Sequence, residues 1–594
     1  MSAVTPPPSE SSATPSQPTP MSAGHLIVRQ LETEGVRRVY TVPGESFLDV
    51  LDGLYDSPVH TVVCRQEGGA GFAALTEARL TNRPGIAMVT RGPGAANAMI
   101  SVHTAYQDAT ALVLFMGLIP TEQRGREAFQ EFDPHAWFGS TAKKVLILDH
   151  PDSAARIVSD ALHTAASGRP GPVIVGLPED TLLELTSSPP VPPRPLAAPA
   201  PAPHEVAALE DAVASAACPL LVVGGQGWTP AAATSLSAWA SARGVGIVAD
   251  FRAHDAVDHA QDVFLGPLGY SSFAGTREAM ADADLQILVG CVRGDIMTGS
   301  YAFGTSPDRT IVAGPDPDAH GHFGPLDQLI VATPETLATA LAAGLGQTTD
   351  TTAEAAETDA AGTGPGAAQV PATGTSVTGQ TSGTGTSAAW YRPYRDRYQE
   401  WRTGVVGAAP RAEFLDRDRA YRDAADVLPR DVVVTYGAGN YSAWALRYWP
   451  LQGPGSVAAP RNGAMGMGTP AAVAAKLAQP QRPVIGLAGD GCFMMNGQEF
   501  ATAVDQGLNI TIIVDDNSVF GTIVGHQVRE YPGRPSGTSV TNPDFAALAD
   551  SYGGRGFSVT RTEEFVPMLQ EAMAYDGPAL LHIRTDPEVR LPRT

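Results

Sequence analysis

Short, nearly continuous apolar runs recur along this chain, and they limit its fold more than any other feature. Three examples are PVIVGL (172–177), LQILVGC (285–291) and PVIGLAGD (483–490). Strands of a parallel sheet read this way because helices cover both faces of the sheet. Helical patterns lie between the runs, as at residues 69–82 and 153–166. The alternation predicts an α/β protein built from doubly wound parallel sheets.

Segments of biased composition divide the chain. Residues 187–205 are rich in proline and are expected to form an extended linker. Residues 346–388 consist mainly of glycine, alanine, threonine and serine, so they cannot bury a core and are expected to form a second linker. Residues 1–20 are expected to be a disordered tail and not a signal peptide, because they lack an apolar stretch. Since 594 residues exceed one hydrophobic core, we predict three domains, at 21–186, 206–345 and 389–594.

The first and third of these domains contain similar segments near their ends. GRPGPVIVGLPED (168–180) and YDGPALLHIRTDP (575–587) both read as a turn, Gly-Pro, an apolar strand and an acidic exit. Because Gly-Pro before a last strand is common, this similarity alone is weak evidence for a repeated unit.

The charge balance and the cysteines exclude several classes of protein. The formal net charge is −23, and no cluster of Lys and Arg forms the basic face that a nucleic-acid-binding protein needs. No apolar run approaches the ~20 residues of a membrane-spanning helix. The four cysteines form no CxxC pair, which favours reduced thiols and a cytoplasmic protein. They are Cys64, Cys218, Cys291 and Cys492.

Two polar residues follow neighbouring strand patterns in the third domain. AGDG (488–491) ends one apolar strand, and ITIIVDD (510–516) leads directly to Asn517. Because the carboxyl ends of parallel strands face one crevice, Asp490 and Asn517 can converge there. A carboxylate, an amide oxygen and a backbone carbonyl form a hard-oxygen set suited to Mg²⁺. For a lone GDG the alternative, a strand-end cap and a turn residue, would be preferred.

GDG followed after 25 residues by Asn resembles the signature of thiamine diphosphate (ThDP)-dependent enzymes. The resemblance implies that the metal is held by the side chains of Asp490 and Asn517 and by the backbone carbonyl of Val519. It also implies that the GDG segment lies against the cofactor's diphosphate. The backbone N–H groups at the end of this segment would donate hydrogen bonds to the diphosphate. The diphosphate contacts implied are Gly489, Gly491 and Cys492.

Two further segments resemble cofactor-binding loops of this family. GAGNYSAW (437–444) resembles the other diphosphate loop and implies contacts from Gly439 and Asn440. APRNGAMGMGTPAAVAAKLA (459–478) resembles the segment that holds the aminopyrimidine ring, and it implies the Gly463 carbonyl and Met465 as contacts. The alternative is that Met465 is an ordinary core methionine, although its glycine-flanked setting argues against this.

A glutamate in the first domain is the predicted catalytic acid/base. CRQEGGAGFAA (64–74) places Glu67 after the strand HTVVC, and the segment resembles the family's Arg-x-Glu-x-x-Ala motif. The resemblance implies that Glu67 contacts the pyrimidine N1′ position. The alternative is a solvated glutamate favoured at a helix start. Because the family builds its site between two subunits, the resemblance also implies a homodimer or homotetramer.

Within the family, the chain resembles the large subunit of acetolactate synthase. TVPGESFLDVLDGL (41–54), TRGPGAANA (90–98) and AFQEFD (128–133) carry this resemblance. It implies decarboxylation of pyruvate or a similar 2-oxo acid, transfer of the acyl carbanion to a second 2-oxo acid, and a substrate pocket that includes Phe129 and Gln130. The alternatives are a 2-oxo acid decarboxylase, a specialised carboligase or lyase, or a binding subunit without catalysis. The intact Glu67, Asp490 and Asn517 count against the last of these. The need for a separate regulatory subunit stays open.

The chain departs from the acetolactate synthase pattern around the predicted acceptor pocket, at Ile523–His526. Where that family has a tryptophan after the metal asparagine, this chain has His526, and a family lysine is replaced by Glu179. The flavin (FAD) of those synthases also stays open, because its motif is reduced to GCVRGDIMTG (290–299) and the loop GGQGW (224–228) is common after strands.

Overall fold

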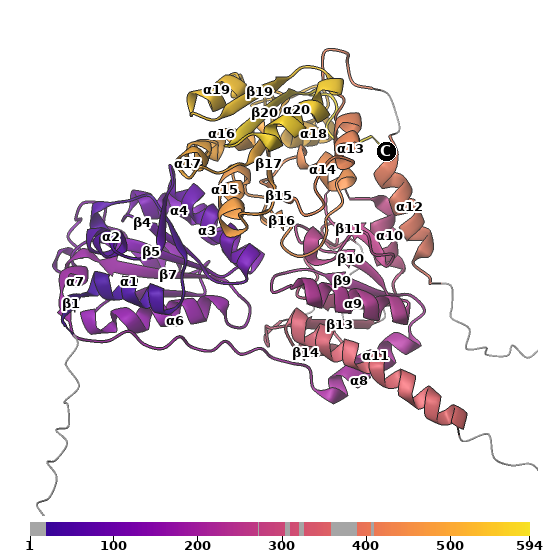
Figure 1. Cartoon of the computed structure of the whole chain (residues 1–594), viewed down its shortest axis with the longest axis horizontal. Helices are drawn as coiled ribbons and strands as arrows, with labels where there is room; N and C mark the ends of the chain where they lie inside the picture. The colour runs from indigo at the N-terminus through magenta and orange to yellow at the C-terminus, as the bar shows by residue number, and fades with distance from the viewer. Residues whose placement is uncertain are drawn as a thin grey trace, which may run out of the picture.

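The computed structural model describes residues 19–270, 272–302, 309–319, 326–357, 389–405 and 409–593. Three domains follow one another, and each has a six-stranded parallel sheet between helices (Figure 1). The predicted fold class is thereby confirmed. Most of the predicted tail and of the 346–388 linker lie outside the described residues.

The N-terminal domain has the strand order β3-β2-β4-β5-β7-β6. One face of the sheet packs against α1, α2 and α6, and the other against α3 and α4. A two-residue antiparallel pair, β1 with β8, closes the domain. The strands are β1 (Met21–Ser22), β2 (Arg38–Thr41), β3 (His60–Val63), β4 (Gly85–Val89), β5 (Leu112–Leu118), β6 (Lys144–Ile147), β7 (Pro172–Pro178) and β8 (Leu185–Thr186), and the helices are α1 (Ala23–Thr33), α2 (Leu48–Tyr55), α3 (Glu67–Thr81), α4 (Pro93–Asp108), α5 (Pro134–Phe138), α6 (Ala154–Ala166) and α7 (Glu179–Leu183).

Residues 187–202, which include most of the predicted proline-rich linker, form neither helix nor strand. The start of this segment is held against α1. The Gln30 side chain donates to the Val191 carbonyl at 2.9 Å and accepts from the Val191 N–H at 2.8 Å.

The middle domain has the strand order β11-β10-β9-β12-β13-β14. The sequence assigned residues 389–594 to the third domain. Helix α12 (Arg392–Thr403) packs on the middle domain instead, because its Tyr398 is buried there, edge-on against Phe264. Helix α11 continues past residue 345, the predicted end of the domain. The strands are β9 (Pro219–Val223), β10 (Gly246–Ala249), β11 (Phe264–Pro267), β12 (Leu285–Val289), β13 (Arg309–Gly314) and β14 (Gln328–Val331), and the helices are α8 (Pro203–Ser215), α9 (Pro230–Arg243), α10 (Ala274–Asp282), α11 (Pro334–Glu357) and α12 (Arg392–Thr403).

The C-terminal domain repeats the topology of the N-terminal one, with the order β16-β15-β17-β18-β20-β19. The two similar sequence segments form β7 and β20, which occupy corresponding places in the two sheets. The strands are β15 (Val433–Tyr436), β16 (Val457–Ala458), β17 (Val484–Gly489), β18 (Thr511–Asp516), β19 (Arg555–Val559) and β20 (Ala579–Arg584), and the helices are α13 (Arg417–Ala425), α14 (Ser442–Tyr448), α15 (Gly468–Ala478), α16 (Asp490–Asn496), α17 (Glu499–Asp505), α18 (Gly521–Glu530), α19 (Phe545–Ser551) and α20 (Thr562–Ala574).

Helix α3 joins the two outer domains. Met467, Ala471 and Ala474 of the C-terminal domain belong to the same core as the α3 and α4 face of the N-terminal sheet. The Glu499 carboxylate accepts hydrogen bonds from the backbone N–H groups of Arg65 and Gln66, at 2.9 and 3.0 Å. The start of α3 is therefore fixed by the C-terminal domain of the same chain.

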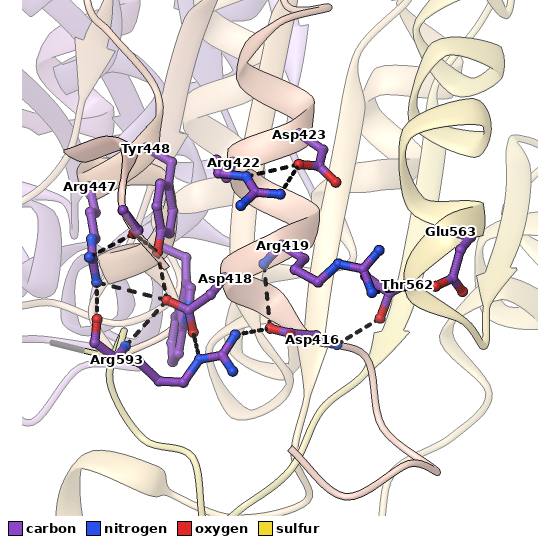
Figure 2. A network of polar contacts seen from close by, with 12 residues as sticks. Asp416, Asp418, Arg419, Arg422, Asp423, Arg447, Tyr448, Thr562, Glu563 and Arg593 are labelled. Carbon is purple, nitrogen blue, oxygen red and sulfur yellow. Dashed lines mark hydrogen bonds and ion pairs between the residues drawn. The ribbon is translucent and has the colours of Figure 1, made fainter. Parts of the chain in front are cut away.

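The segment after β20 is fastened to α13 by Arg593 (Figure 2). Its guanidinium donates to Asp416 at 2.6 Å and to Asp418 at 3.1 Å. One turn of the same helix supplies Arg417, which donates to Asp515 of β18 at 3.0 Å. This network supports the strand that leads to Asn517. In the part of the chain that the structure describes, no helix is long and apolar enough to cross a membrane.

Candidate functional site

The two predicted metal-ligating side chains lie at the same edge of the C-terminal sheet. Strands β17 and β18 are adjacent and parallel, with Gly489 opposite Asp515. Asp490 begins α16 directly after β17, and Asn517 follows β18 directly. Ser518 has a left-handed backbone (φ 56°), and this turn brings the Val519 N–H to 3.1 Å from the Asn517 Oδ1.

Asp490 is almost fully buried, with 4% of its surface exposed. Its Oδ1 accepts from the Gly491 N–H at 2.8 Å, and its Oδ2 accepts from the Asn542 amide at 2.7 Å. Burial raises the pKa of the Asp490 carboxyl to about 6, against the opposing effect of these two hydrogen bonds. A cation bound beside this carboxylate would oppose the effect of burial by stabilising the negative charge.

The donor set fits a metal that also binds an anion. Among the described residues, no group of three or more His, Cys, Asp and Glu side chains is arranged to hold a metal ion. The predicted set contains one carboxylate, one amide oxygen and one backbone carbonyl. Mg²⁺ keeps octahedral coordination and commonly takes phosphate oxygens and water beside one or two carboxylates, so a diphosphate would complete this set.

Tyr441 and the thiol of Cys492 connect three of the predicted cofactor segments. The Tyr441 hydroxyl donates to the Cys492 Sγ at 3.2 Å and accepts from the Gly437 N–H at 3.0 Å. The same Sγ accepts from the Gly466 N–H at 3.1 Å. Gly439 has φ 144°, and a Cβ added there would lie 2.7 Å from the Tyr441 ring. The sequence indicated Cys492 only through its backbone and did not single out Tyr441.

The predicted diphosphate and acceptor segments also meet. The Asn440 Oδ1 accepts from the Thr522 hydroxyl at 3.0 Å, at the start of α18. Helix α18 has no buried residue, and 50% of the Ile523 side chain is exposed. His526 is exposed, and its ring forms a 2.7 Å hydrogen bond with the Arg529 guanidinium. A polar pair thus stands where the resemblance implies an aromatic residue.

The two methionines of the predicted aminopyrimidine segment differ in burial. Met467 is completely buried in the core shared with α3 and α4, whereas Met465 is partly buried at the margin of the C-terminal core. Gly463 has a left-handed backbone (φ 71°) with open space where a Cβ would stand. Core packing therefore accounts for Met467, and the predicted contacts from Gly463 and Met465 remain available.

Glu67 is the first residue of α3 and is half-buried. Its Oε2 accepts from the Asn97 amide at 2.9 Å, and a Cβ added at Gly94 would lie 3.4 Å from its Oε1. Within the described residues of one chain, no hydrogen bond or ion pair joins Glu67 to Asp490 or Asn517.

The predicted substrate residues Phe129 and Gln130 lie in the N-terminal domain after β5. Phe129 is 74% exposed. Gln130 lines a cavity of about 240 Å³ together with Arg124 and His135, and its Oε1 is buried without a hydrogen-bond partner among the described residues. No described contact within one chain joins this cavity to Ile523 or His526.

Glu179, which replaces a lysine of the acetolactate synthase pattern, forms an ion pair with an arginine. The buried Arg91 guanidinium donates to Glu179 at 2.7 Å and to Glu45 at 3.1 Å. An acidic residue is therefore tolerated where the family has lysine, because this chain supplies its own cation from the loop after β4.

The glycines that suggested a flavin turn have a packing role. A Cβ added at Gly225 would lie 2.0 Å from the Gly290 carbonyl oxygen, and one added at Gly290 would lie 2.3 Å from that of Gly224. The cavity beside Gly225 and Trp228 measures about 30 Å³, which is room for water. Parts of the surrounding loops, 303–308 and 320–325, lie outside the described residues.

Two arginines, the buried Arg252 and the partly buried Arg461, anchor the predicted cofactor loops to the other domains, and the sequence did not reveal them. Arg252 of the middle domain donates to the Gly437 carbonyl at 2.8 Å and stacks on the Tyr436 ring. The Arg461 guanidinium forms an ion pair with Asp250, and the Arg461 backbone N–H donates to the Asp108 carboxylate at 2.7 Å. Arg461 stands within the quoted 459–478 segment, two positions before Gly463, but nothing in that segment indicates its partners Asp250 and Asp108.

Three family models match the chain. They are the N-terminal TPP-binding domain of thiamine pyrophosphate enzymes at residues 21–137, the central domain at 206–341 and the C-terminal TPP-binding domain at 437–583. The chain belongs to the thiamine pyrophosphate enzymes, whose cofactor is ThDP, and the expected family is thereby confirmed.

Curated relatives match along nearly the whole chain. It is 29% identical to the acetolactate synthase isozyme 2 large subunit of Escherichia coli, over 95% of this chain and 96% of that protein. It is 27% identical to the probable acetolactate synthase large subunit of Methanocaldococcus jannaschii, over 96% and 93%. It is 27% identical to the mitochondrial acetolactate synthase catalytic subunit of Saccharomyces cerevisiae, over 96% and 81%.

Proposed function

We propose that this chain is a ThDP- and Mg²⁺-dependent carboligase of acetolactate synthase type. It would decarboxylate pyruvate or a similar 2-oxo acid and transfer the acyl carbanion to a second 2-oxo acid. The observation that carries the proposal is the convergence of Asp490 and Asn517 at one sheet edge, in a chain similar to acetolactate synthases along its whole length.

In this proposal each predicted residue has one task. Asp490, Asn517 and the Val519 carbonyl hold Mg²⁺, and the loops at Gly439–Asn440 and Gly489–Cys492 bind the diphosphate. Gly463 and Met465 position the aminopyrimidine ring. When bound, ThDP supplies a carbon nucleophile and an electron sink. Glu67 holds and moves the proton at the pyrimidine N1′ position.

The proposed enzyme is a homodimer or a homotetramer. The half-buried Glu67 and the exposed α18 support this, because each presents a predicted site residue at the surface of a single chain. The site would form where Glu67 meets Asp490 of the partner subunit. Four free cysteines support a cytoplasmic location, and the acetolactate synthase relatives support a role in branched-chain amino-acid synthesis.

The products formed from pyruvate test the proposal. With ThDP and Mg²⁺ we expect acetolactate from pyruvate alone, and a mixed product when 2-oxobutyrate is added, both identified by mass spectrometry. Removing the metal with a chelator should abolish turnover, and added Mg²⁺ should restore it. Acetaldehyde as the only product would instead establish a decarboxylase, and absence of ThDP binding would overturn the proposal.

A different carboligase or lyase is the second candidate, and the His526–Arg529 pair favours it. A polar pair at the predicted acceptor pocket, in place of an aromatic residue, would suit an acceptor other than pyruvate. A panel of 2-oxo acids offered as donor and as acceptor separates the two candidates. The same purified protein decides the flavin question, because bound flavin gives visible absorption bands that ThDP does not.

A further inference from the structure

Asn542 lies between two carboxylates at the metal-binding edge of the C-terminal sheet. Its amide nitrogen donates to the Asp490 Oδ2 at 2.7 Å and to the Asp516 Oδ1 at 2.8 Å. An amide NH₂ group has two protons, so both are used. Asp490 is the proposed metal ligand, and Asp516 immediately precedes the second one, Asn517.

The backbone brings Asn542 to this place. Residues 538–540 run antiparallel to the turn that follows Asn517. The Phe520 N–H donates to the Thr538 carbonyl at 2.8 Å, and the Val540 N–H donates to the Ser518 carbonyl at 3.0 Å. The chain therefore reaches Asp490 from the side of the metal-binding turn, and the position of Asn542 is fixed by the same turn that places Val519.

The neighbouring carboxylate is itself fully engaged. The Asp516 Oδ1 also accepts from the backbone N–H and hydroxyl of Ser518, each at 3.0 Å. Its Oδ2 forms a 3.0 Å hydrogen bond with the His582 ring. Both Asp516 oxygens are therefore occupied by hydrogen bonds, so Asp516 is not available as a metal ligand. Asn542 is an uncharged group that lies between the Asp516 and Asp490 carboxylates.

We propose that Asn542 is a positioning residue for the metal site. Its amide fixes the orientation of the Asp490 carboxylate and screens it from Asp516, so that Asp490 is held ready to bind the metal before the metal arrives. The proposal rests on the proposed function, because it takes Asp490 as a ligand of Mg²⁺. Hydrogen-bond partners of metal ligands typically contribute 10–100-fold to metal affinity.

The test is a calorimetric titration of Mg²⁺ into the full-length protein in the presence of ThDP. We expect Asn542→Leu, which removes the donor at similar size, to weaken Mg²⁺ binding by about 10–100-fold. Asn542→Ala, which adds no apolar bulk, should do the same and serves if the leucine variant does not fold. At saturating Mg²⁺, ThDP binding should return in both variants, because Asp490 and Asn517 are intact.

Asn509→Leu is the matched control. Asn509 is exposed and lies just before β18, at the end of the strand opposite the metal site. This variant should bind Mg²⁺ like the wild type. Melting temperatures measured without ThDP and metal separate positioning from stability, because a purely structural Asn542 would lower the melting temperature and leave the affinity of the folded protein unchanged.

The outcomes distinguish the two levels of inference. Wild-type Mg²⁺ affinity in both Asn542 variants would overturn the positioning role alone. If the wild-type protein itself bound no Mg²⁺ with ThDP, the proposed function would fail, and the positioning role with it.

Discussion

Replacing Glu67 by glutamine is expected to lower kcat with pyruvate by about 10²–10⁴-fold, the contribution typical of a positioned general acid/base. Glutamine has the same size, and its carbonyl oxygen can still accept the hydrogen bond that Asn97 donates to Glu67. Only the ability to hold and release a proton is lost. Steady-state kinetics measures the effect, while calorimetry with ThDP and Mg²⁺ should show cofactor binding close to that of the wild type.

Glu122→Gln is the control for this change, since Glu122 is exposed in the short helix at Thr121–Gln123 and should leave kcat unaltered. Glu67→Gln protein that turns over pyruvate like the parent would remove Glu67 from the mechanism.

Co-expression tests whether the site is shared between subunits. Glu67→Gln and Asp490→Ala chains are each expected to be inactive, but a mixed dimer pairs the intact Glu67 of one chain with the intact Asp490 of the other. Recovery of activity in the mixture is therefore expected. A mixture that stays inactive would place both residues in the same subunit's site.

The fold was predictable, and so was the sheet edge that Asp490 and Asn517 share, because both depend on local sequence patterns. Apolar runs marked buried parallel strands, and strand ends marked Asp490 and Asn517. Even the similarity of residues 168–180 to 575–587 was informative, since β7 and β20 occupy corresponding places in sheets of the same topology. These features can be predicted without knowing which residues far apart in the sequence are in contact.

The contacts between distant side chains were not predictable from the sequence. Asn542 reaches Asp490 across 52 positions, and Tyr441 reaches Cys492 across 51. Asn542 lies in none of the quoted segments, and Tyr441 lies in GAGNYSAW without being one of the residues that the resemblance implies as a contact. The three-domain contacts of Arg461 are likewise set by domain packing and not by its neighbours in the sequence.

Replacing Arg461 by methionine is expected to destabilise the protein by about 3 kcal/mol. This is the lower end of the range for removing one partner from a buried ion pair, because 24% of the Arg461 side chain is exposed. The Asp250 side chain is fully buried, and Arg461 is the cation that pairs with it. Burial alone raises the pKa of Asp250, and Arg461 opposes this shift. Without the guanidinium, the carboxylate must either stay charged in an apolar setting or take up a proton. The measurement is the melting temperature of the cofactor-free protein.

The double variant Arg461→Met with Asp250→Asn separates the ion pair from simple packing. It leaves no buried charge unpaired, so it should be more stable than Arg461→Met alone, because partners in one pair do not act additively. Arg156→Met, on the exposed face of α6, should change stability by at most about 0.5 kcal/mol. Since Arg461 stands two positions before Gly463, we also expect Arg461→Met to weaken ThDP binding in the protein that remains folded. A double variant no more stable than Arg461→Met would show that the packing of the arginine side chain, and not its charge, joins the three domains.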